Sequence, residues 1–367
     1  MKRVFRLETQ SPVSQQENKE ATVSKNLGRL LGRLTTLFFA IFITPNLSLA
    51  QGTTSCFEGT DAVNHTLGDN PETLREGVGS FHLPDYGKAG LTVHYVRPQS
   101  FSTSSPILLV VPGAGRNSDD YRDAWIDAAC ASGTLVAALG YSEEHYDFAG
   151  YNMGGTISNL QFDNPSFSRV SETATTITLD DSDIRFDVAT NRADWLFNDL
   201  DLVFEHLVQT TGSEVEKYDI FGHSAGGQIL HRLAIFAPRS RARAIIAANA
   251  GFYTFPDLSQ ALPTGIKGTG LGEADLSEAF GKRLVLMLGA LDNDDQAGGT
   301  LLHTPHIDQS QGLGRLDRGL RFFKHSRDQA KRMDTTFNWQ IEVIDDVGHD
   351  YRAMSAAAAD YLINLID

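Results

Sequence analysis

The stretch Lys217–Gly227, which reads KYDIFGHSAGG, joins two segments of different periodicity. Tyr218–Phe221 has the apolar character of a short buried strand, and Gln228–Phe236 has the apolar spacing of a helix. Between them, residues 222–226 match the pattern G-x-S-x-G, in which a sharp strand-to-helix turn exposes a serine hydroxyl. The stretch therefore predicts a reactive serine, Ser224, at a turn of this kind.

The residue types around Ser224 fit this chemistry. One glycine lies two positions before the serine and another lies two positions after it, where side chains would clash as strand and helix close up. The backbone N–H of Ala225 would lie at the start of the helix, where free N–H groups stabilise negative charge. A Gly-rich turn without a catalytic role can have the same five-residue pattern. An acid and a base further along the chain are therefore needed to distinguish a catalytic serine from such a turn.

An acid and a base follow later strands in the chain. Asp292 comes after a strand predicted at Arg283–Leu288, and His349 comes after a strand predicted at Asn338–Ile344. Parallel strands bring their carboxyl ends to one edge of a sheet, so both side chains can meet Ser224 there. A serine nucleophile requires such a base, and the base requires an acid that orients it.

Other acids and histidines compete for these positions. Asp294 is the nearest alternative to Asp292, and Asp257 would supply the acid from the preceding strand. The remaining histidines considered lack a matching position after a strand and are expected to be structural or to face solvent: His223, His231, His303, His306 and His325.

In its order of serine, acid and histidine, the sequence resembles the α/β-hydrolase superfamily. The resemblance implies that Ser224 is the nucleophile, Asp292 the acid and His349 the base of an acyl transfer that needs no metal or organic cofactor. It also implies an oxyanion hole made by the N–H of Ala225 and a second N–H from the loop after the strand Pro106–Val111.

That loop departs from the pattern of the superfamily. The superfamily usually has His-Gly at its start, whereas this chain has Pro112 in the first position. Ala114 is the expected second donor, with Gly115 as the alternative. The motif GHSAGG together with an export signal is most similar to secreted esterases of the feruloyl esterase and polyhydroxybutyrate depolymerase-like branch, which implies hydrolysis of carboxylic esters.

Three classes of function remain open on this evidence. The first is a serine hydrolase of carboxylic esters that acts on a small-molecule ester. The second is a serine peptidase or acyltransferase on the same fold, because a triad does not select the leaving group. The third is a binding protein on an inactive hydrolase scaffold.

Strands and helices alternate along the chain, which predicts an α/β fold with a doubly wound, mostly parallel sheet and helices on both faces. One catalytic domain is expected at 51–367, with an irregular lead at 51–90 that holds one early strand and an irregular excursion or cap at 141–191. The other expected strands are Leu91–Val96, Pro106–Val111, Thr134–Leu139 and Ala242–Ala248, and the expected helices are Ser118–Ala131, Trp195–Thr211, Leu316–Met333 and Met354–Ile366.

Residues 1–50 have the features of an export signal. Basic residues precede an apolar run at Leu34–Ile43, and Ser48-Leu49-Ala50 matches a cleavage site, so cleavage after Ala50 and a secreted or periplasmic protein are expected. The apolar run is short for a membrane span, although a retained anchor is the alternative.

The charge of the chain excludes several partners. The net charge is −15, and removing seven basic and three acidic residues with the signal makes it −19. Such a surface repels phosphate backbones and anionic membranes, so no nucleic acid and no stable membrane association are expected. The spacing of Cys, His and acidic residues indicates no metal site.

Two further expectations concern the cysteines and the substrate. Cys56 and Cys130 are the two cysteines of the chain, and we expect them to pair, with a free, buried Cys130 as the alternative. The aromatic segment 252–255 follows a strand that ends beside Ser224, so its rings either line a pocket for the acyl group or pack under the next loop. Soluble, neutral esters of short or aromatic acids are expected to react faster than emulsified long-chain triglycerides.

Overall fold

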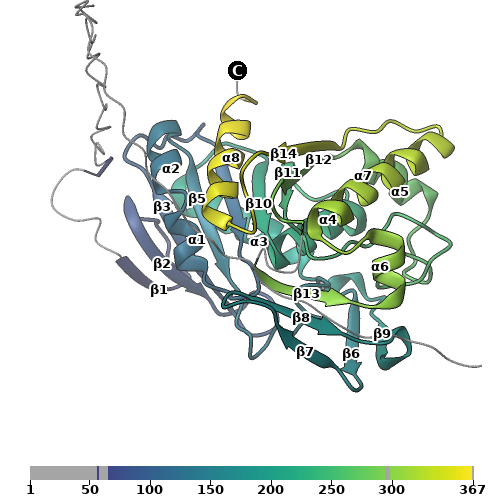
Figure 1. Cartoon of the computed structure of the whole chain (residues 1–367). Coiled ribbons are helices and arrows are strands. Elements are labelled where there is room, and N and C mark those ends of the chain that lie inside the picture. The colour runs from purple at the N-terminus through teal and green to yellow at the C-terminus, as the bar shows by residue number, and fades with distance from the viewer. Residues whose placement is uncertain (1–55, 58–64, 294–297, 366–367) are drawn as a thin grey trace, which may run out of the picture. The chain divides into compact units, whose positions relative to one another are not determined.

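The centre of the molecule is a twisted sheet whose strands run mostly in parallel (Figure 1). The computed structural model describes residues 56–57, 65–293 and 298–365. Within these residues the sheet has nine strands, in the spatial order β1 (His65–Asp69), β2 (Gly77–Leu83), β3 (Leu91–Arg97), β5 (Leu135–Gly140), β4 (Ile107–Val111), β10 (Tyr218–His223), β11 (Ala242–Ala248), β12 (Arg283–Gly289) and β14 (Gln340–Ile344).

The direction of the strands confirms the predicted fold class. From β5 to β14 all neighbours are parallel, and β3 is antiparallel to both β5 and β2. The central strands are mostly apolar, and nearly all of their residues are buried, as is typical of parallel sheets covered on both faces. The predicted lead was wrong in one respect, because residues 65–83 form two strands rather than one.

Two hydrophobic clusters cover the two faces of the sheet. One contains the apolar sides of α3 (Phe197–Thr211), α4 (Ala225–Phe236), α5 (Glu273–Gly281) and α7 (Arg315–Arg332). The other contains those of α1 (Ser118–Asp123), α2 (Ile126–Ser132) and α8 (Tyr351–Ile363). The sheet is thus a middle layer, and Figure 1 shows α8 and α4 on opposite sides of β10.

The excursion at 141–191 is more regular than the sequence predicted. It holds β6 (Ile157–Phe162) and β9 (Ile184–Val188), which pair with each other, and β7 (Ser166–Arg169) and β8 (Ala174–Thr178), which form a second pair. It also holds a short 3₁₀ turn at Asp181–Asp183, and another such turn, Arg192–Asp194, directly follows the excursion. β8 also pairs in parallel with β13 (Gly299–His303), which precedes α6 (Pro305–Gln311). The prediction of irregular structure was therefore wrong, because β13, more than a hundred residues further along the chain, completes a small second sheet. We call residues 141–191 with β13 the cap.

A disulfide joins Cys56 to Cys130 across 74 residues, which confirms the predicted pairing. Cys130 lies in α2, so the bridge fastens the start of the described chain to one helical layer. Contacts between residues define Thr53–Asp367 as one compact unit. The expected signal at 1–50 lies outside the described residues, and within them no helix is long and apolar enough to span a membrane.

Candidate active site

Ser224 occupies a strained turn between β10 and α4. Its backbone has φ of 58° and ψ of −114°, a conformation that side-chain-bearing residues rarely adopt and that is found mainly at functional sites. A methyl group on Gly226 would come within 2.1 Å of the Val111 oxygen, and one on Gly222 would come within 2.7 Å of Gly226. Both glycines of the G-x-S-x-G pattern are therefore required by the close approach of helix and strands.

The structure brings the three predicted residues together. His349 Nε2 lies 3.0 Å from Ser224 Oγ, and His349 Nδ1 lies 2.7 Å from Asp292 Oδ2. Because a carboxylate only accepts hydrogen bonds, the proton of the neutral ring lies on Nδ1, and Nε2 is free to accept the serine proton. Ser224 follows β10, Asp292 follows β12 by three residues and His349 follows β14, so parallel strand ends position all three.

The surroundings of His349 keep its ring neutral. Burial lowers the pKa of His349 below its usual value, and the nearby Arg315 guanidinium lowers it further, while Asp292 and Asp350 act in the opposite direction. Burial also places the pKa of the adjacent His223 well below its usual value. A neutral imidazole beside a serine hydroxyl is the form that can take up a proton.

His223 lies closer to the site than the sequence indicated. Its ring centroid is 4.5 Å from that of His349, and its Nδ1 is hydrogen-bonded to Tyr121 Oη at 3.1 Å. It packs behind the base and binds neither Ser224 nor Asp292. The other histidines considered bind elsewhere: His231 to Gly227 and Thr254, His303 to Asp308, His306 to Thr264, and His325 to Asp257.

The alternative acid Asp257 does not bind the base His349. The Asp257 carboxylate binds Ser259 and Gln260 and pairs with His325, whereas the ring nitrogens of His349 are bound to Asp292 and Ser224. Asp294 lies outside the described residues.

The expected oxyanion donors line the same cavity as Ser224. Ala225 is the first residue of α4, and Ala114 lies in the exposed loop after β4. Neither N–H is bonded to another group in the described part of the chain. The Tyr151 hydroxyl donates to the Pro112 oxygen at 2.7 Å, which fixes the start of this loop.

A cavity of about 560 Å³ opens above Ser224. One wall is apolar and joins the cap to the core: Phe148, Phe162, Ile177, Phe252 and Leu302. Phe148 and Phe252 stack in parallel with centroids 6.2 Å apart, whereas Tyr253 and Phe255 are buried against Phe322 beneath it. Of the aromatic segment 252–255, Phe252 therefore lines the cavity, while the other two rings belong to the core.

A slightly larger hollow, of about 610 Å³, lies at the opposite end of the strands. It is lined by the first residues of β11, β12 and β14 and by basic side chains such as Lys217 and Lys282. None of the three candidate catalytic residues lines it. Its larger size therefore does not make it a candidate active site.

Arg315 is a site residue that the sequence did not reveal. It lies at the start of α7, is 1% exposed, and its Nη1 is 3.0 Å from Asp292 Oδ1. Its Nη2 donates to the Thr300 oxygen of β13 at 3.2 Å. A polar helix rich in Arg and Lys looks solvent-exposed in sequence, so only the tertiary structure shows that this arginine is buried on the acid.

Comparisons with solved structures identify hydrolases that are similar to this chain. Neither protein-family models nor curated proteins match the chain. Among solved structures, poly(aspartic acid) hydrolase-1 from Sphingomonas sp. KT-1 is 33% identical with a TM-score of 0.66, and the match covers 78% of this chain and 98% of that one. LpqC, a poly(3-hydroxybutyrate) depolymerase from Bordetella parapertussis, is 26% identical with a TM-score of 0.66, over 79% and 91% of the two chains.

These relatives are hydrolases, and the identity to the first extends over nearly its whole length. The chain therefore belongs to the α/β-hydrolase superfamily.

Proposed function

We propose that the protein is a serine hydrolase that cleaves carboxylic esters through an acyl-enzyme intermediate. The observation that carries this proposal is the chain of hydrogen bonds from Ser224 through His349, which both line one cavity, to the buried Asp292. Packing alone does not require a strained serine, a neutral buried imidazole and a buried carboxylate that are joined by successive hydrogen bonds. An inactive binding protein is disfavoured for the same reason.

Each residue has a distinct role in the proposed reaction. His349 Nε2 takes the proton from Ser224 Oγ as the oxygen attacks the ester carbonyl, and Asp292 holds the ring and stabilises its charged form. The N–H groups of Ala225 and Ala114 bind the oxyanion of the tetrahedral intermediate. His349 then gives its proton to the leaving alcohol, and a water activated by the same nitrogen releases the acid.

The comparisons support hydrolysis of a polymer or small molecule. They leave open whether the cleaved bond is an ester or an amide. The depolymerase relative acts on poly(3-hydroxybutyrate), a polyester, whereas the relative of higher identity acts on poly(aspartic acid), a polyamide with a carboxylate on each unit. The net charge of −15 disfavours a polyanionic substrate here. Esters are therefore the first candidate, and amides are the second because of the 33% identity.

The cavity supports a small acyl group. Its apolar wall is built largely from aromatic rings, and its volume of about 560 Å³ is that of a site for a small molecule. Neutral esters of short or aromatic acids fit such a cavity. Strong activation on emulsified long-chain triglycerides, with little turnover of short esters, would contradict this part of the proposal.

Labelling with a fluorophosphonate tests the mechanism directly. The folded protein should form an adduct on Ser224, and Ser224→Ala should lose about 10⁴-fold or more in kcat while its unfolding midpoint stays the same. A folded wild-type protein without an adduct would reject the mechanism. A panel of p-nitrophenyl esters beside matched p-nitroanilides and poly(aspartic acid) then separates esterase from amidase activity.

We also infer that the protein is exported. The basic and apolar segments before Ala50 and the disulfide between Cys56 and Cys130 support this inference, because disulfides persist mainly outside reducing compartments. Sequencing the amino terminus of the protein recovered from the periplasm or medium should give Gln51. A mature protein that retains residues 1–50 would contradict the cleavage.

A further inference from the structure

The two oxygens of the Asp292 carboxylate accept hydrogen bonds from two different side chains. Oδ2 accepts from His349 at 2.7 Å, and Oδ1 accepts from Arg315 at 3.0 Å. Asp292 and Arg315 are each 1% exposed or less, so water does not screen the pair. Among the described residues, Asp292 is the carboxylate that pairs with Arg315.

Arg315 also reaches the cap. Its Nη2 donates to the Thr300 oxygen at 3.2 Å, and Thr300 lines the cavity as part of β13. The preceding residue, Gly299, has φ of 67°, and a methyl group on it would come within 2.9 Å of His349 Nε2. One guanidinium therefore binds the acid and the cap strand that passes closest to the base.

We propose that Arg315 is a positioning residue of the catalytic pair: it holds the Asp292 carboxylate toward His349 and ties that carboxylate to cap strand β13. The planar fork of an arginine suits this role, because it presents two N–H groups in fixed directions to two different acceptors. The role rests on the proposed serine hydrolase mechanism.

The charged groups around His349 determine how removal of Arg315 changes the pKa of His349. Asp292 follows β12, Asp350 precedes α8, Arg315 lies on α7, and the neutral His223 ends β10. Arg315 is the cation of this set, and it lowers the pKa of His349. Since His349 acts as a base only when unprotonated, activity rises with pH through its pKa, and removing Arg315 moves this acidic limb to higher pH.

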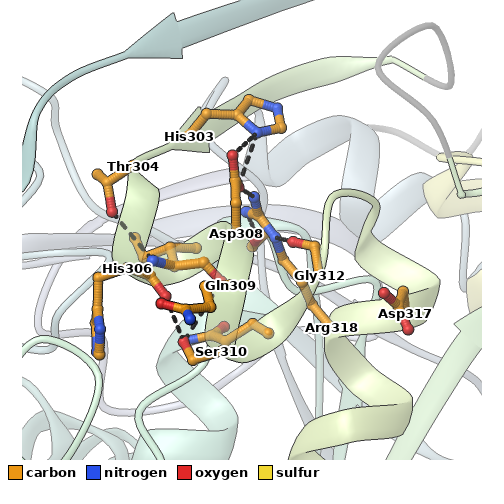
Figure 2. A network of polar contacts seen from close by, with 12 residues as sticks. His303, Thr304, His306, Asp308, Gln309, Ser310, Gly312, Asp317 and Arg318 are labelled. Atoms are coloured by element: carbon orange, nitrogen blue, oxygen red, sulfur yellow. Dashed lines mark hydrogen bonds and ion pairs between the residues drawn. The ribbon is translucent and has the colours of Figure 1, made fainter.

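Arg318 provides a matched control on the same helix. It is also buried and pairs with a carboxylate, that of Asp308, and it binds the oxygens of Gly251 and Gly312. Figure 2 shows Asp308 between Arg318 and His303, a network that does not include Asp292. Arg318→Met therefore removes a buried charge from α7 without touching the catalytic pair.

The experiment measures the rate of fluorophosphonate labelling at Ser224 against pH, per folded molecule. For Arg315→Met we expect the acidic limb to move up by about one pH unit, and for Arg318→Met we expect it to stay at the wild-type position. Arg315→Lys keeps the charge but loses the fork, so its limb should stay in place while the rate falls about tenfold.

Each outcome bears on the proposal. If the acidic limb of Arg315→Met coincides with that of the wild type, the proposal is overturned. Equal shifts of the acidic limb in Arg315→Met and Arg318→Met would also overturn the proposal. If Arg315→Met does not fold, Arg315→Lys decides, because a purely structural arginine predicts an unchanged rate per folded molecule. A wild-type protein that is not labelled at Ser224 would refute the proposed mechanism itself, which is a separate result from a labelled protein with an unmoved limb.

Discussion

Asp199 should make the stability of this protein fall as the pH rises toward 7. Its side chain lies on α3 and is 8% exposed. Burial raises the pKa of Asp199 to about 7, against the opposing effects of Tyr141 and Lys88. The folded protein therefore keeps a proton on this carboxyl group at a pH where the unfolded chain, with its ordinary value of 3.8, has already released it.

The sign and size of the effect follow from proton linkage. Between 3.8 and about 7 the folded state binds more protons than the unfolded state, so the free energy of unfolding decreases as the pH rises. Each unit corresponds to about 1.36 kcal/mol, and the two units from about pH 5 to about pH 7 therefore correspond to about 2.7 kcal/mol as an upper value. Above the folded pKa the loss is complete and the contribution stays constant.

Asp199→Asn removes this dependence, because an amide of the same shape does not titrate. Urea unfolding at pH 5 and pH 8 should show that the wild type loses more free energy of unfolding than the variant between the two conditions, by up to about 2.7 kcal/mol. Asp127→Asn, on the exposed surface of α2, serves as the control and should follow the wild type. Parallel curves for the wild type and Asp199→Asn would refute the reasoning.

Three other outcomes can be checked with simple variants. Asp292→Asn should lower kcat by about 10⁴-fold by leaving the base in the wrong tautomer, whereas Asp257→Asn should keep most of the activity; the reverse result in ester kinetics would reassign the acid. Reduction of the bridge between Cys56 and Cys130 should cost about 4 kcal/mol on the chain-entropy estimate for a loop of 74 residues, and an unchanged melting temperature would argue against it. Phe252→Ala should raise KM for aromatic esters more than for acetate esters, and equal changes for both would remove the ring from the acyl wall.

The fold and the three residues now found in one hydrogen-bonded line were largely predictable from the sequence, for a local reason. Strands such as β4 and β11 are continuous apolar runs, and the residues that the chemistry needs come directly after strand ends. A residue that directly follows a parallel strand lies at the carboxyl edge of the sheet, where the residues after the neighbouring parallel strands also lie. The nine-stranded order itself depends on pairings between distant segments and was not available from periodicity.

The cap was hidden from sequence reasoning for the opposite reason. β7 has four exposed residues, and β6 and β9 have few buried ones, so no apolar alternation marks them as strands. The sheet of β7 and β8 is completed by β13, which follows Asp292 rather than the excursion. A pairing of this kind between distant segments leaves no local signal.

The cap contacts the start of the loop after β4, which holds the proposed oxyanion donor Ala114. Where the superfamily usually has a histidine, this chain has Pro112, whose oxygen accepts from the Tyr151 hydroxyl, and the Arg116 guanidinium lies 3.4 Å above the Tyr151 ring. Arg116 also donates to the Tyr146 oxygen. Residues of the 141–191 segment thus hold a loop whose own sequence lacks the usual anchor, and Arg315 joins β13 to the acid on the other side of the cavity. The cap therefore contacts the loop of the proposed oxyanion donor and, through Arg315, the proposed acid Asp292, so we expect changes in the cap to alter the geometry of the candidate site.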